Sequence, residues 1–91
     1  MEHLTFLNQG GAYVAEFVAT TDFNLHIEKS DGGGLFFYQK SIYEGNYAPI
    51  KDIKFGQSDY CLDEDFSGVV YPKYIKIVSN TMPEVAVVTF A

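Results

Sequence analysis

The sequence contains no arginine and no tryptophan, and it holds a single cysteine, Cys61. Six lysines stand against twelve carboxylates, which gives a formal net charge of −6. Nucleic-acid binding depends largely on cationic side chains that contact phosphate, so this balance argues against a nucleic-acid partner. One cysteine cannot form a disulfide within the chain, so the cysteine count does not identify a redox compartment.

Long apolar runs are also missing. No run approaches the roughly 18 residues that a transmembrane helix needs, so we expect no transmembrane segment. Residues Met1 to Leu4 lack the basic and apolar segments of a secretory signal peptide. Two localisations therefore stay open, the cytoplasm or secretion with a leader removed.

Aromatic and β-branched residues are plentiful, whereas strong helix formers are comparatively scarce. Phenylalanine and tyrosine make up 16% of the chain, and these residues suit the half-buried surface of a pleated sheet. A length of 91 residues corresponds to one domain, which we expect to span residues 1–91 around one thin core. Composition therefore favours a small all-β domain.

Apolar and polar residues alternate along several segments with the period of two that is typical of strands. The pattern predicts strands over residues 4–8 and 12–20, joined as a hairpin across Gly10 and Gly11. Residues 23–28 form the cleanest alternation, with Phe23 on the face predicted to be buried.

Turn signals separate the predicted strands about every 8–12 residues, and no segment shows a helical period. Pro49 indicates that residues 47–55 form an edge strand or a strand that begins after Pro49. We expect seven or eight short strands in an antiparallel β-sandwich, immunoglobulin-like or C2-like in shape.

Four aspartates form a candidate metal site. Residues 63–68 read as an acidic loop, and Ca²⁺ prefers several carboxylate oxygens on such loops. The candidate ligands are Asp31, Asp59, Asp63 and Asp65. Their spacing is not that of an EF-hand, and a solvated acidic turn is the competing interpretation. Ca²⁺ is the only cofactor that the sequence suggests.

Histidine and cysteine show no recognisable pattern for zinc binding or catalysis. His3, His26 and Cys61 are isolated from one another, whereas structural zinc sites use paired ligands a few residues apart. We expect His26 to be a surface histidine and Cys61 to be a buried small hydrophobe. No Gly-x-Ser-x-Gly elbow is present, so we expect a protein without enzymatic activity.

Tyrosines cluster in the second half of the chain, several of them beside turns. Tyrosine offers a large contact area for little lost rotamer freedom, which suits a binding face. The candidates for such a face are Tyr43, Tyr47, Tyr60 and Tyr71. The competing interpretation is that tyrosines cap the core with their hydroxyls in water.

Three functions are compatible with these patterns. The first is a non-catalytic binding module for a protein or a carbohydrate. The second is a Ca²⁺-dependent module that binds membranes or carbohydrates through its acidic loops. The third is a self-assembling structural protein, a homo-oligomer that pairs through an exposed edge strand over residues 85–90.

Overall fold

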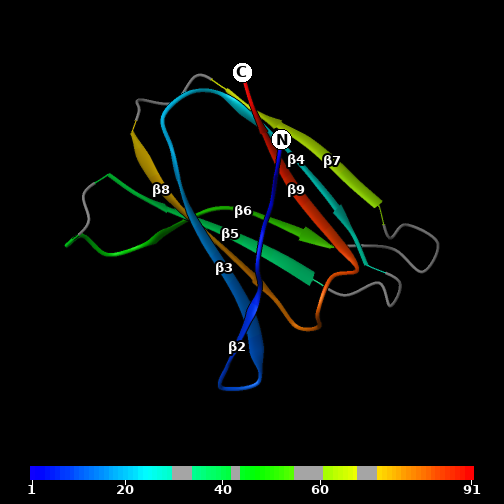
Figure 1. The fold of residues 1–91 in the computed structure, drawn as a ribbon. Coiled ribbons are helices and arrows are strands. Elements are labelled where there is room, and N and C mark those ends of the chain that lie inside the picture. The colour runs from blue at the N-terminus through cyan, green and yellow to red at the C-terminus, as the bar shows by residue number, and fades with distance from the viewer. Residues whose placement is uncertain (30–33, 42–43, 55–60, 68–71) are drawn as a thin grey trace.

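The computed structural model describes residues 1–29, 34–41, 44–54, 61–67 and 72–91, without the side chains of residues 34 and 50–54. These residues form nine β-strands in two antiparallel sheets (Figure 1). None of them belongs to a helix, so the described chain contains no helix that could cross a membrane. The predicted all-β fold is confirmed, and the chain is a β-sandwich.

Sheet A has four strands in the order β1-β9-β4-β7. Their bounds are β1 Glu2–His3, β9 Val85–Phe90, β4 Phe23–Glu28 and β7 Cys61–Phe66.

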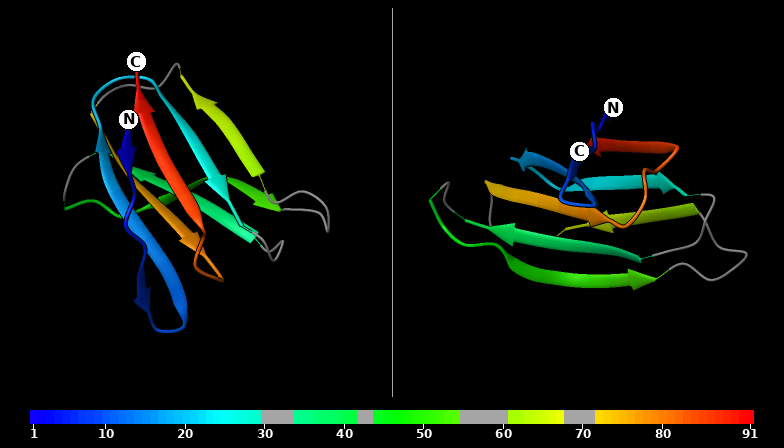
Figure 2. Two further views of the ribbon diagram at one scale, coloured as in Figure 1. Left: turned by 45° about the vertical axis from the view of Figure 1, so that its right-hand side comes forward. Right: turned by 90° about the horizontal axis from the view of Figure 1, so that it is seen from below.

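Sheet B has five strands in the order β2-β3-β8-β5-β6. Their bounds are β2 Leu7–Gln9, β3 Ala12–Ala19, β8 Lys73–Ser79, β5 Gly34–Lys40 and β6 Ala48–Lys54. Two further views show the two sheets after a turn of 45° and from below (Figure 2).

The first hairpin forms where the sequence predicts it. Strands β2 and β3 pair with Gln9 opposite Ala12, and Gly10 and Gly11 make the turn with φ angles of +66° and +93°. Residues that carry a Cβ rarely adopt such φ angles, so glycine suits both positions. The Asn8 side chain also accepts a hydrogen bond from the Gly11 amide at 3.2 Å.

The structure corrects the predicted first strand over residues 4–8, of which only Leu7 and Asn8 belong to a strand, β2. Strand β1 belongs to sheet A and β2 to sheet B, and the chain between them crosses from one sheet to the other. The Leu4 amide donates to the Ala86 carbonyl at 2.9 Å, and Phe6 is buried. The alternation of residues 4–8 therefore reflects a crossing segment that fills the space between the sheets. The two-residue strand β1, which precedes the predicted strand, raises the strand number to nine.

The core lies between the sheets and follows the predicted alternation. In β4 the buried positions alternate with half-buried ones, and Asn24, His26 and Glu28 point to the outer face. In β3, Ala15 and Ala19 face the core while Glu16 and Val18 face outward. The large apolar side chains with no exposed surface are Phe37, Leu25, Ile27, Leu35, Ile77 and Val88.

An aromatic cluster joins the two sheets. The rings of Phe23 and Phe66 in sheet A are stacked with centroids 4.9 Å apart. Phe17 and Phe37 of sheet B contact this pair, with centroids 5.3 Å from Phe23 and 5.6 Å from Phe66 respectively. Offset and edge-to-face pairs of this kind add to the energy of burial, so the cluster fixes how the sheets are packed.

The structure confirms one predicted edge strand and corrects another. Pro49 lies in β6, which is an edge of sheet B, where a residue without an amide proton is tolerated. Strand β9, predicted to be an exposed edge, instead lies between β1 and β4. Strand β1 pairs only with Val87 and Val88, and this short strand covers what would otherwise be the edge. The edge of sheet A opposite β1 is β7.

Candidate functional site

The outer faces of the two sheets differ in chemistry. On sheet A, β4 and β7 present histidine, cysteine and carboxylate side chains. On sheet B, β5 and β8 present tyrosine and lysine side chains, and β3 presents Glu16 and Val18 beside them. Each face holds residues that the sequence marks as candidates.

The predicted acidic loop is a strand over most of its length. Asp63 to Phe66 belong to β7, which pairs with β4 so that Asp63 lies opposite His26 and Asp65 opposite Asn24. Leu62 and Phe66 pack against the core. Because the aspartates occupy alternate positions, β7 keeps them in water while it buries its apolar residues. This pattern outweighs the low β propensity of aspartate.

Two of the four predicted calcium ligands are brought together. The Asn24 side-chain amide donates to Asp63 Oδ1 at 2.5 Å and to Asp65 Oδ1 at 2.9 Å. A neutral donor thus stands between two carboxylates that would otherwise repel each other. Asp31 and Asp59 lie outside the described residues, so the calcium site stays a prediction.

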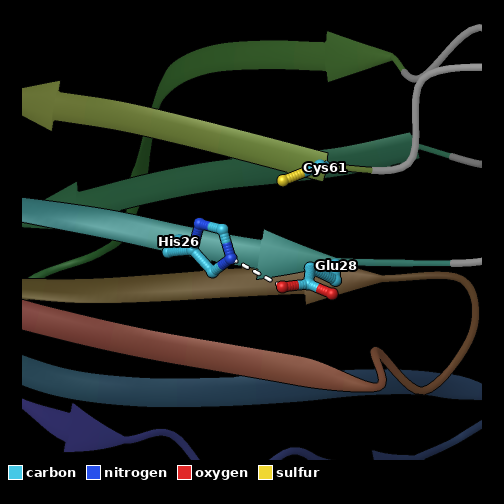
Figure 3. Close-up of side chains that lie close together, drawn as sticks. All are labelled: His26, Glu28 and Cys61. Atoms are coloured by element: carbon cyan, nitrogen blue, oxygen red, sulfur yellow. Dashed lines mark hydrogen bonds and ion pairs between the residues drawn. The ribbon is translucent and has the colours of Figure 1, made fainter.

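His26 and Cys61 are neighbours, contrary to the expectation that they are isolated. Antiparallel pairing places Cys61 opposite Glu28, and His26 lies two residues from Glu28 on the same face. His26 Nε2 and Glu28 Oε2 are 2.7 Å apart, and Cys61 Sγ completes a group whose three atoms lie within 4.8 Å of one another (Figure 3). Cys61 is exposed rather than buried.

The remaining histidine does not join this group. His3 pairs with Val87, which in turn pairs with His26, so β9 separates the two histidines. The prediction that His26 faces outward is confirmed. Glu28 was missed because its relation to Cys61 depends on the pairing of β4 with β7, which the sequence does not specify.

Tyr47 is the centre of the second group. The Lys40 and Lys76 ammonium groups lie 4.4 Å and 4.7 Å from its ring centroid. Its hydroxyl donates to Glu16 Oε1 at 3.0 Å. The other three tyrosines predicted to form a binding face, Tyr43, Tyr60 and Tyr71, lie outside the described residues.

Two more tyrosines extend this group. Lys40 Nζ lies 5.7 Å from the ring centroid of Tyr74, and Lys76 Nζ lies 5.2 Å from that of Tyr38. Neither tyrosine is among the residues that the sequence predicts for a binding face. The signal that identifies them is alternation, because Tyr38 and Tyr74 occupy outward positions of β5 and β8 beside the lysines.

A shallow groove runs along this group. It encloses about 370 Å³ and is lined by Glu16, Phe17, Val18, Lys40, Tyr47 and Tyr74. We call the wider surface the tyrosine–lysine face, which comprises Glu16, Val18, Tyr38, Lys40, Tyr47, Tyr74 and Lys76. Val18 is 45% exposed, so the face offers apolar contact as well as charge.

Comparison of the chain with protein-family models, with curated proteins and with solved structures finds no significant match.

Proposed function

We propose that this chain is a non-catalytic binding module and that the tyrosine–lysine face is its contact surface. The partner is a protein segment that combines carboxylate and apolar side chains. The observation that carries the proposal is the position of Tyr47 between two lysine ammonium groups, with its hydroxyl bonded to Glu16.

The first support is preorganisation. Lysine side chains normally lose considerable rotamer freedom when they are fixed in a complex. Here cation–π contacts with Tyr47 already restrain Lys40 and Lys76, and the hydrogen bond to Glu16 restrains the ring. Less entropy is therefore lost when a partner binds.

The second support is the distribution of charge. Among the side chains that the structure describes, Lys40 and Lys76 share the tyrosine–lysine face with one carboxylate, Glu16, whereas Asp63 and Asp65 lie on the outer face of sheet A. In a chain of net charge −6, these cations mark the side on which an acidic partner meets least repulsion.

The third support concerns the kind of partner. The ring centroid of Tyr47 lies within 5 Å of both ammonium groups, so a sugar stacking on this ring would have to displace them. A carboxylate instead gains from the same cations. Val18, which is 45% exposed, supplies apolar contact of the kind found at protein interfaces. These features favour a protein segment over a carbohydrate.

The experiment is a titration of the ¹⁵N-labelled chain with two synthetic peptides, followed by NMR. One peptide alternates glutamate and leucine, and the other alternates lysine and leucine. We expect the glutamate peptide to shift amide signals of β3, β5 and β8 but not those of β4 and β7. We expect the lysine peptide to leave the tyrosine–lysine face unchanged.

A matched pair of variants separates this face from a general effect of charge. Lys76→Glu and Lys73→Glu change the net charge equally, but Lys73 bonds to Ser41 outside the tyrosine–lysine face. We expect Lys76→Glu to weaken binding of the glutamate peptide at least tenfold and Lys73→Glu to weaken it about twofold. Equal losses, or shifts confined to sheet A, would contradict the proposal.

A further inference from the structure

Three different metal-binding side chains meet on the outer face of sheet A, away from the tyrosine–lysine face. His26 and Glu28 come from β4 and Cys61 begins β7, and all three point to the same side of the sheet (Figure 3). Their ligand atoms lie within 4.8 Å of one another. We propose that these residues form a binding site for a divalent transition metal of the zinc class.

The combination of donor atoms selects the class of ion. A thiolate is a soft ligand, an imidazole nitrogen is intermediate and a carboxylate oxygen is hard. Zn²⁺ and Co²⁺ accept all three, whereas Ca²⁺ and Mg²⁺ prefer sites built from oxygen alone. The ligand set of His26, Glu28 and Cys61 therefore fits a zinc-class ion better than calcium.

The geometry requires only local adjustment. Metal–ligand bonds of 2.0–2.3 Å in a tetrahedral site place donor atoms roughly 3.3–3.6 Å apart. His26 Nε2 and Glu28 Oε2 are already 2.7 Å apart, and Cys61 Sγ lies within 4.8 Å of both. The ion takes the position between Nε2 and Oε2 that the hydrogen bond now spans, and the thiol rotates toward it.

Strand pairing holds the ligands in this arrangement. Glu28 and Cys61 are directly opposite each other in the β4–β7 ladder, and alternation places His26 and Glu28 on one face. The backbone atoms of all three ligands thus belong to paired strands and not to loops. Sites on regular elements lose less entropy when the ligands close on an ion.

Coordination has a defined proton balance. Cys61 binds as the thiolate and releases one proton to the solvent. His26 binds through an unprotonated Nε2, so its ring proton resides on Nδ1. Three protein ligands leave the fourth tetrahedral position for a water molecule, and the side chains of His26 and Glu28 are 34% and 44% exposed. The site is therefore open to solvent.

The test is a titration of the full chain with Co²⁺ under a phosphine reductant, which keeps Cys61 reduced. We expect one-to-one binding with a thiolate-to-cobalt charge-transfer band and the visible bands of tetrahedral Co²⁺. We expect Zn²⁺ to abolish these bands by displacement. In NMR of the wild-type chain, Zn²⁺ should shift the ring signals of His26 and leave those of His3 in place.

Variants assign the ligands. We expect Cys61→Ser to remove the charge-transfer band and weaken Co²⁺ binding at least tenfold, and His26→Ala to weaken it similarly. His3→Ala removes a histidine of the same sheet outside the group and should leave affinity within about twofold. The proposal would be overturned if the charge-transfer band were absent or if Cys61→Ser bound Co²⁺ with unchanged affinity. It would also be overturned if Zn²⁺ shifted the ring signals of His3 in place of those of His26.

Discussion

Lys29 is completely buried, and its ammonium group donates a hydrogen bond to the side-chain oxygen of Asn80 at 2.6 Å. Lys29 follows the last residue of β4 in sheet A, and Asn80 follows the last residue of β8 in sheet B. Fully buried lysines are rare and need partners, because an uncompensated charge in the interior is costly. The contact links the two sheets at one end of the sandwich.

Two substitutions of Lys29 separate its aliphatic stem from its charge. We expect Lys29→Ala to lower the free energy of unfolding by about 2–4 kcal/mol, because it removes the stem and leaves a cavity. Lys29→Met keeps most of the volume and should cost about 1–2 kcal/mol for the lost hydrogen bond to Asn80. Urea denaturation measures both values. A larger loss for methionine than for alanine would contradict this assignment.

Substitutions of the two glycines in the β2–β3 turn should act through backbone conformation. A Cβ added at Gly10 or Gly11 meets no atom within 4 Å, but both residues have positive φ angles. We expect Gly11→Ala to cost about 1–2 kcal/mol of stability, since L-residues disfavour this region. Asparagine tolerates positive φ angles better than alanine does. Gly10→Asn should therefore lower the stability less than Gly10→Ala. Equal thermal midpoints for Gly10→Asn and Gly10→Ala would rule out the conformational explanation.

The aromatic cluster should dominate stability. Phe37 has no exposed surface and its ring contacts that of Phe66 with centroids 5.6 Å apart. We expect Phe37→Ala to cost about 3–5 kcal/mol, which is a large share of the stability of a domain of this size. Val18→Ala, at a position that is 45% exposed, is the control and should stay within about 0.5 kcal/mol of wild type. Chemical denaturation tests both, and comparable losses would show that Phe37 is not a principal core residue.

Asn24 provides a test of the calcium prediction. Asn24→Asp replaces the donor between Asp63 and Asp65 with a third carboxylate. In the presence of a chelator, we expect Asn24→Asp to lower the free energy of unfolding by about 1 kcal/mol, because like charges on paired strands repel each other. If the aspartates bind Ca²⁺, millimolar CaCl₂ should raise the melting temperature of this variant and, by a smaller amount, that of the wild type. Asn24→Ser is the uncharged control, and no response to CaCl₂ in any of the three proteins would end the calcium interpretation.

Local pattern predicted much of the fold. The alternation in β3 and β4, the two-glycine turn and the edge position of Pro49 are all confirmed. These features depend on the period of a strand and on backbone sterics, which act between residues close in sequence. The same reasoning correctly placed His26 on the outer face.

The candidate sites were only partly predictable. Tyr47 was selected, but the contribution of Lys40, Lys76 and Glu16 to its surroundings was not. The three residues come from three separate strands that meet in sheet B. Two of the four predicted calcium ligands, Asp63 and Asp65, accept hydrogen bonds from the same Asn24 side chain. Asn24 lies about 40 residues earlier in the sequence, so this contact was not predicted.

The sequence by itself determined that the chain forms short strands, which sides of β3 and β4 are apolar, and where the first hairpin turns. Only the tertiary structure decided that β9 lies inside sheet A, that residues 63–66 form a strand, and that Cys61 lies beside His26 and Glu28. The physical reason is that alternation specifies a face but not a partner. Strand order and register depend on how all the apolar faces are buried together, and this is a property of the whole sandwich.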